Sequence, residues 1–111
     1  MGHLTYAGAT EYQIEDRMLA HLKTVIASKL RRQESFLVSW TVEPDSGSGR
    51  VSLWMSPSVP LEFRFAGSRP PQLNGVWLEV LAEMANTARG LVLVGEAEAE
   101  AIHRGEAPPE H

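Results

Sequence analysis

The stretch that decides the fold is FLVSWTVEPDSGSGRVSLWMSPSVPLEFRF, residues 36–65. Within it, apolar and polar side chains alternate in three runs, over residues 36–42, 51–56 and 61–65, which is the pattern of half-buried strands. Short turns rich in glycine, serine and proline separate the runs. Strands joined so closely tend to pair with their neighbours in sequence, so the stretch predicts an antiparallel meander.

Helical periodicity lies on both sides of this stretch. From Asp16 to Arg32, and again from Leu73 to Ala88, apolar residues recur every three or four positions, which predicts two amphipathic helices. Asn74 is placed to cap the second helix, and Gly90 to end it in the left-handed conformation. The pattern is completed by two short strands, at residues 3–7 and 91–94, and by a polar turn at residues 8–11.

These elements predict an α/β fold of the α+β kind, a two-layer sandwich in which a mostly antiparallel sheet of about four or five strands carries both helices on one face. The domain is expected to span residues 1–95. An acidic tail, expected to be disordered, follows at residues 96–111. Nothing in the sequence remains to cover the other face of the sheet, which is expected to carry Leu37, Ser39, Thr41, Ser52, Trp54, Glu62 and Arg64.

Composition narrows the class of protein. A chain of 111 residues suits one domain. Because it contains no cysteine, it can have neither a disulfide framework nor a thiolate metal site, and a reducing compartment fits. The opening residues do not resemble a secretory signal, and no apolar run approaches the ~18 residues of a membrane helix. We therefore expect a soluble, cytoplasmic protein that binds no membrane.

Catalytic and metal-binding motifs are missing from the sequence. The four histidines have no second ligand at a short spacing, so no metal is expected. There is no Gly-x-Ser-x-Gly elbow, and the glycines at 47 and 49 precede a predicted strand rather than the helix that a phosphate loop needs. Paired carboxylates such as Glu79 and Glu83 fall on polar helix faces. We predict no catalytic residue and no cofactor, and hence a non-enzymatic protein.

The uncovered sheet face supplies the leading functional hypothesis. An exposed aromatic side chain is costly unless a partner hides it, so Leu37, Trp54 and Arg64 form the candidate interaction surface, and a second copy of the chain is the simplest partner. Nucleic acid is the alternative partner, since phosphates attract cations and bases stack on aromatic rings. The candidate anion or nucleic-acid contacts are Arg31, Arg32, Arg50 and Arg69.

The tail and one loop add two smaller hypotheses. Glu96, Glu98 and Glu100 are placed to fold back over Arg31 and Arg32 and to shield them from polyanions, while the tail itself is expected to be dispensable for folding. The loop at residues 67–74 contains Arg69, whose guanidinium is suited to binding an anion. A small-molecule site at this loop is therefore the third hypothesis, in which the protein is an enzyme.

Across most of residues 1–95 the chain resembles a group of small uncharacterised actinobacterial proteins. The resemblance rests on residues 19–23, 29–32, 34–36, 53–54, 57–61, 67–69 and 73–74. It implies no established activity, although similar proteins are sometimes labelled ATP-dependent DNA ligase. Such a ligase needs a nucleophilic lysine in a Lys-x-Asp-Gly setting, whereas Lys23 begins Lys-Thr-Val-Ile and Lys29 begins Lys-Leu-Arg-Arg. The residues therefore do not support that label.

Overall fold

The computed structural model describes residues 1–42 and 49–106 of the chain. Within these residues the chain forms an α+β fold of three helices and two small, mostly antiparallel sheets, which confirms the predicted fold class. In chain order the elements are β1 (Gly2–Tyr6), β2 (Thr10–Ile14), α1 (Asp16–Arg31), β3 (Phe36–Val42), β4 (Gly49–Met55), β5 (Leu61–Arg64), α2 (Gly75–Ala85), β6 (Leu91–Val92) and α3 (Glu96–His103).

The strands are divided between two three-stranded sheets rather than joined in one. The first has the order β2-β1-β5 and the second the order β4-β3-β6, with β6 parallel to β3. The predicted hairpin of β3 and β4 is present, with Phe36 opposite Met55. The predicted meander is wrong, because β5 pairs with β1 and not with β4. Pro57 and Pro60 lie in the connection between β4 and β5, and proline cannot continue a ladder of hydrogen bonds.

The sequence-based prediction missed β2, which pairs with β1 in an antiparallel hairpin. Ala7, Gly8 and Ala9 connect the two strands; Ala7 and Gly8 have φ values of 56° and 68°, and the Ala9 N–H donates to the Tyr6 carbonyl at 3.1 Å. Two successive positive φ values are typical of a type I′ hairpin turn. Alanine is a rare choice there, so the usual Asn-Gly signal was absent.

The two predicted helices are present with small changes at their ends. Asn74 caps α2 as expected, since its side chain accepts hydrogen bonds from the N–H groups of Val76 and Trp77. The helix ends at Ala85, earlier than predicted, and Gly90 does not terminate it. Gly90 has a φ of 87° and directly precedes β6, where an added Cβ would lie 2.7 Å from the Leu37 Cβ. Because glycine has no Cβ, Gly90 allows β6 to approach β3 closely.

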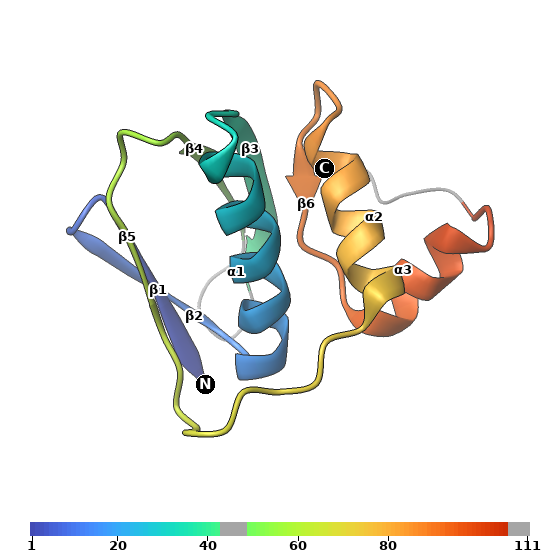
Figure 1. Cartoon of the computed structure of the whole chain (residues 1–111), viewed down its shortest axis with the longest axis horizontal. Coiled ribbons are helices and arrows are strands. Elements are labelled where there is room, and N and C mark those ends of the chain that lie inside the picture. Colours follow the sequence, from blue (N-terminus) through green and yellow to red (C-terminus); the bar gives the residue numbers. More distant parts are fainter. Residues whose placement is uncertain (43–48, 107–111) are drawn as a thin grey trace.

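The hydrophobic core lies around α1. Figure 1 shows α1 in the middle of the molecule, with β1, β2 and β5 on one side and β6, α2 and α3 on the other. The largest fully buried apolar side chains come from both sheets and from α1 and α2, and they are Leu4, Leu19, Leu22, Ile26, Val38, Met55, Leu81 and Leu91. One core thus joins the two sheets.

The expected disorder of residues 96–111 does not extend to residues 96–103, which form α3. Figure 1 shows α3 beside α2, and Ala99 on its inner face is fully buried. Ala99 packs against the core, whereas Ala97, Glu98 and Glu100 are exposed. Residues 107–111 of the expected tail, and residues 44–48 of the expected turn, lie outside the described residues. Over residues 1–42 and 49–106, no helix has the length and apolarity needed to span a membrane.

Candidate functional site

Two of the three residues of the candidate interaction surface lie side by side. Leu37 on β3 is directly opposite Trp54 on β4. The Trp54 side chain is 53% exposed, whereas Leu37 is half-buried against Gly90. An indole half in water is an unusual position for so large an apolar group. Leu37 and Trp54 therefore form the apolar end of the exposed face of the β3–β4 hairpin.

Arg64, the third residue of that surface, lies in the other sheet. It is on β5, opposite His3 of β1, and its guanidinium pairs with Glu62 Oε2 at 2.7 Å. Tyr6, which contacts Trp54, is at the other end of the same strand pairing, opposite Leu61. The structure thus separates Arg64 from Trp54, because β5 is not the third strand of a meander.

The face of β3 and β4 is open mainly along β4. Ser39 is only 5% exposed, although the predicted open face included it. Its hydroxyl lies 2.7 Å from that of Ser52, the residue directly opposite. Arg50, opposite Thr41, is exposed like Ser52 and Trp54. The exposed side chains of β4 therefore run from a cation at one end to an indole at the other.

The backbone of β4 has an outer edge. The N–H of Leu93 donates to the Ser39 carbonyl at 2.9 Å. Because the N–H and C=O of one strand residue point to the same side, Ser39 directs both groups toward β6, and Ser52 opposite it directs both away from β3. Because the direction of these backbone groups alternates along a strand, the N–H and C=O groups of Arg50 and Trp54, two residues on either side of Ser52, also point away from β3. The Trp54 carbonyl accordingly accepts the Tyr6 hydroxyl at 2.7 Å.

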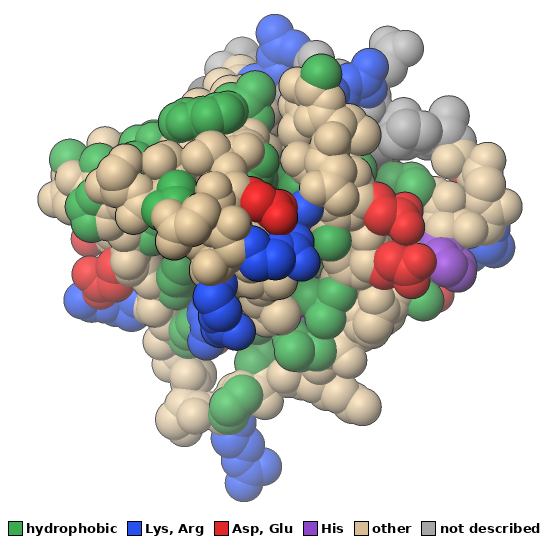
Figure 2. Space-filling view, turned by 45° about the horizontal axis from the view of Figure 1, so that its top comes forward, with side chains coloured by type: hydrophobic (Ala, Val, Ile, Leu, Met, Phe, Trp, Pro, Cys, Tyr) green, Lys and Arg blue, Asp and Glu red, His purple; other side chains and the backbone are tan. Residues whose placement is uncertain are grey.

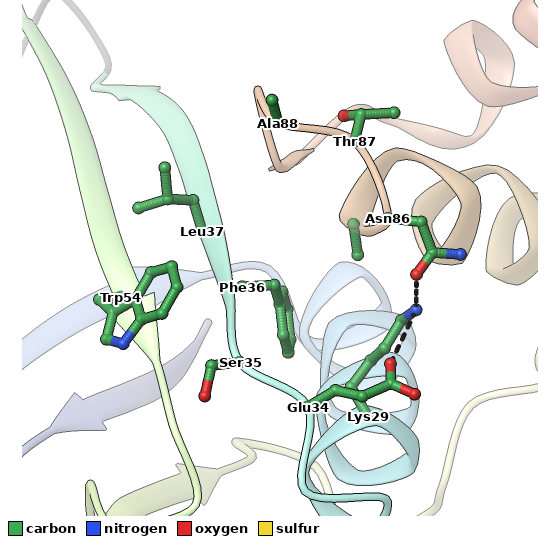
Figure 3. A pocket seen from close by; sticks show the side chains of 10 residues that line it. Lys29, Glu34, Ser35, Phe36, Leu37, Trp54, Asn86, Thr87 and Ala88 are labelled. Carbon is green, nitrogen blue, oxygen red and sulfur yellow. Dashed lines mark hydrogen bonds and ion pairs between the residues drawn. The ribbon is translucent and has the colours of Figure 1, made fainter.

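A groove of about 530 Å³ runs from Trp54 to the end of α2. Figure 3 shows Trp54 and Leu37 along one side, and Asn86, Thr87 and Ala88 along the other. The groove is also lined by Lys29, Glu34, Ser35, Phe36 and Ala85. It is a shallow hollow between the second sheet and the segment that follows α2.

The charged groups of this groove are paired with one another. Lys29 is only 3% exposed, and its ammonium donates to the Asn86 side-chain carbonyl and lies 3.3 Å from Glu34. The hydrogen bond from Lys29 lowers the pKa of Glu34, and Arg32 lowers it further from 3.0 Å away. The pairing ties the end of α1 to the end of α2. Because these groups hold one another, they are poorly placed for general acid or base catalysis.

The candidate cationic contacts do not gather in one place. Arg31 and Arg32 end α1, near the start of β3, whereas Arg50 lies toward the other end of the hairpin. Arg69 lines a separate hollow of about 230 Å³ with Lys23 and Asp16, near the start of α1. Figure 2 shows positive and negative side chains next to each other on the face it presents, rather than a continuous basic stripe.

Asp16, which lines the same hollow as Arg69, has a structural partner. Its carboxylate accepts hydrogen bonds from the N–H groups of Gly67 at 2.9 Å and Ala66 at 3.2 Å. These two hydrogen bonds lower the pKa of Asp16. The negative charge beside Arg69 is therefore committed to holding the loop after β5, and it also opposes the binding of an anion there.

A polar cluster that the sequence did not predict joins α1, α2 and α3. Arg17 binds both carboxylate oxygens of Glu96, at 2.5 and 2.9 Å, and the Asn74 side chain donates to Glu96 at 2.7 Å. These contacts, with that from Arg17 the largest, lower the pKa of Glu96 to about 2. Glu96 thus lies at the start of α1 rather than over Arg31 and Arg32 at its end.

His21 completes this cluster and is fully buried. Its Nε2 accepts the Asn74 N–H at 2.8 Å, and its Nδ1 lies 2.7 Å from the Arg17 carbonyl. The ring stacks on Trp77 at a centroid distance of 4.1 Å. Since Nε2 accepts and Nδ1 faces an acceptor, the neutral ring with hydrogen on Nδ1 satisfies both contacts. His21 is therefore a packing residue that supports the cap of α2.

The described residues bring together no group of three or more histidine, aspartate or glutamate side chains suited to a metal ion. In a comparison with known proteins, residues 1–96 match the model of a family described as a domain of unknown function, DUF7882. No curated protein and no solved structure matches the chain.

Proposed function

The chain belongs to the DUF7882 family of domains of unknown function, and we propose that it is a non-enzymatic interaction module that associates with a second copy of itself through the face around Trp54. One observation carries this proposal: Trp54 is 53% exposed on an edge strand and borders a groove of about 530 Å³. Exposed aromatic side chains beside a hollow are typical anchors of protein interfaces. Closed twofold dimers are the commonest assembly of one chain with itself.

The charges around the groove support a protein partner rather than a substrate. Lys29 and Glu34 satisfy each other, and Lys29 also binds Asn86. The remaining lining near Trp54 is apolar or carries small hydroxyl groups. Exposed apolar side chains beside charges that are already paired suit a protein interface, in which unpaired buried charges are unfavourable.

Sedimentation of the wild type and of Trp54→Asp tests the proposal. The wild type should be a dimer at about 100 µM, a concentration that would populate even a weak complex, and the variant a monomer. Leu73→Asp is the matched control, because Leu73 is a second exposed apolar residue, 44% exposed, outside this face. A monomeric wild type, or a Trp54→Asp protein that remains dimeric, would contradict the proposal.

A second candidate, accessory nucleic-acid binding, is supported by one feature. Arg50 and Trp54 are both exposed on β4 and share one side of the strand. A cation and an aromatic ring along one strand suit a phosphate and a stacked base. Titration of labelled single- and double-stranded DNA at low salt tests this candidate. Binding at tens of micromolar protein that weakens steeply with salt would support it, and no binding would remove it.

A further inference from the structure

The four sheet edges differ in how well they are protected against pairing. The β5 edge carries the Glu62–Arg64 ion pair, the β2 edge exposes Glu11 and Gln13, and β6 is only two residues long. Charged side chains and short length are the usual devices that keep a strand edge from pairing. β4 is seven residues long, and besides one charged residue, Arg50, it exposes a small hydroxyl and an indole. It is therefore the least protected edge of the described chain.

The edge groups of β4 are suited to a second strand. The N–H and C=O groups of Arg50, Ser52 and Trp54 point outward, as the register with β3 requires. Of these backbone groups, only the Trp54 carbonyl has a hydrogen-bond partner within the described residues, and that partner is the Tyr6 hydroxyl. A carbonyl can accept two hydrogen bonds, so this contact leaves one site free.

We propose that two copies of the chain join by antiparallel pairing of their β4 strands about a twofold axis at Ser52, forming one continuous six-stranded sheet. This proposal rests on the self-association proposed above and specifies how it occurs. Ser52 is the central residue of Gly49–Met55, so this register pairs the whole strand. Each Ser52 then exchanges two backbone hydrogen bonds with Ser52 of the second copy.

The side chains favour the same register. With the axis at Ser52, Arg50 of one copy lies opposite Trp54 of the other, on the same face of the joined sheet. A guanidinium over an indole ring is the strongest common cation–π pair, and twofold symmetry makes the contact twice. Ser52, which is small, leaves room at the centre. An axis at Arg50 would instead set two guanidinium groups against each other, which is unfavourable.

The absence of cysteine gives this register a direct test, because Ser52→Cys introduces the only thiol. In a hydrogen-bonded antiparallel pair the two Cα atoms are about 5.5 Å apart, within the range that a disulfide spans. Thr41→Cys is the matched control, since Thr41 is exposed on β3 opposite Arg50. In the joined sheet its two copies would be separated by three strand spacings, about 14 Å, across the sheet and by a further offset along the strands, which is too far for a disulfide.

Oxidation of dilute protein should convert Ser52→Cys to a covalent dimer and leave Thr41→Cys monomeric on a non-reducing gel. Circular dichroism of the reduced variants checks that both are folded. A wild type that is dimeric in solution, with Ser52→Cys crosslinking no better than Thr41→Cys, would overturn the β4 pairing and leave self-association standing. A monomeric wild type would remove both proposals.

A second variant tests the Arg50–Trp54 contact without altering the backbone. Arg50→Glu should weaken self-association about tenfold, the effect of losing two exposed cation–π contacts. Arg31→Glu makes the same change in charge at an exposed site outside the β4 edge and should leave the dissociation constant unchanged. Equal weakening by both variants would show a general charge effect and contradict this register.

Discussion

At the scale of single residues, Glu96 links three helices. It is the first residue of α3, it binds Arg17 of α1, and it accepts a hydrogen bond from Asn74, the cap of α2. Hydrogen bonds to a charged carboxylate stabilise the ionised form, which is why its pKa falls from 4.5 to about 2. By linkage, the ionised carboxylate stabilises the folded chain.

The first prediction concerns Glu96→Gln. A carboxyl with a folded pKa of about 2, below its ordinary value of 4.5, contributes stability that is complete above pH 4.5 and disappears as the pH falls toward 2. The variant should therefore melt below the wild type at neutral pH, and the two melting temperatures should converge toward pH 2. Glu98→Gln is the control, because Glu98 is exposed on the same helix. A difference between Glu96→Gln and wild type that does not change with pH would contradict this account.

The sequence could indicate some of these residues singly but not the contacts between them. Asn74 was predicted as a cap because the signal for a cap is local. Arg17 and Glu96 are 79 positions apart, and no local pattern marks the two as partners. The exposed position of Trp54 follows from strand alternation alone. The separation of Arg64 from Trp54 does not, because it depends on which strand β5 joins.

At the scale of elements, local periodicity located most strands and both long helices. β3 has the predicted bounds, Phe36–Val42, because a large apolar residue recurs at every second position of that segment. The partners of β5 could not be predicted in the same way, since the pairing of β1 with β5 brings together residues far apart in the sequence. The sequence predicts a tail where α3 lies because residues 96–103 contain three glutamates and one large apolar residue, Ile102. Its buried alanine contributes little to any hydrophobic pattern.

The second prediction concerns α3. Truncation after Gly95 removes Glu96 and the buried Ala99, and it uncovers part of α2. It should lower the free energy of unfolding by more than about 2 kcal/mol, because it combines lost packing with lost support for the α2 cap. Urea denaturation measures the change. Truncation after Glu106 is the control, since it leaves α3 whole. If the two truncated chains are equally stable, α3 does not stabilise the fold.

At the scale of the whole molecule, two small sheets share one core around α1. Neither three-stranded sheet is extensive enough to bury much apolar surface alone, and α1 and α2 supply the rest. The periodicity of the sequence predicts the α+β class, but the division into two sheets depends on where the chain turns after β4. That division leaves β4 at an edge with Trp54 exposed. In the predicted meander, β4 would have been an inner strand.

The third prediction follows from that edge. If two copies pair through β4, unfolding must also separate them, so the native dimer is stabilised by mass action. The melting temperature of the wild type should then rise as protein concentration is increased from about 1 to 100 µM. That of Trp54→Asp should not change, because the variant unfolds as a monomer. Calorimetry across this range measures both proteins. An equal rise for both would show that association occurs elsewhere on the molecule, and a constant melting temperature for both would show that the folded chain needs no second copy.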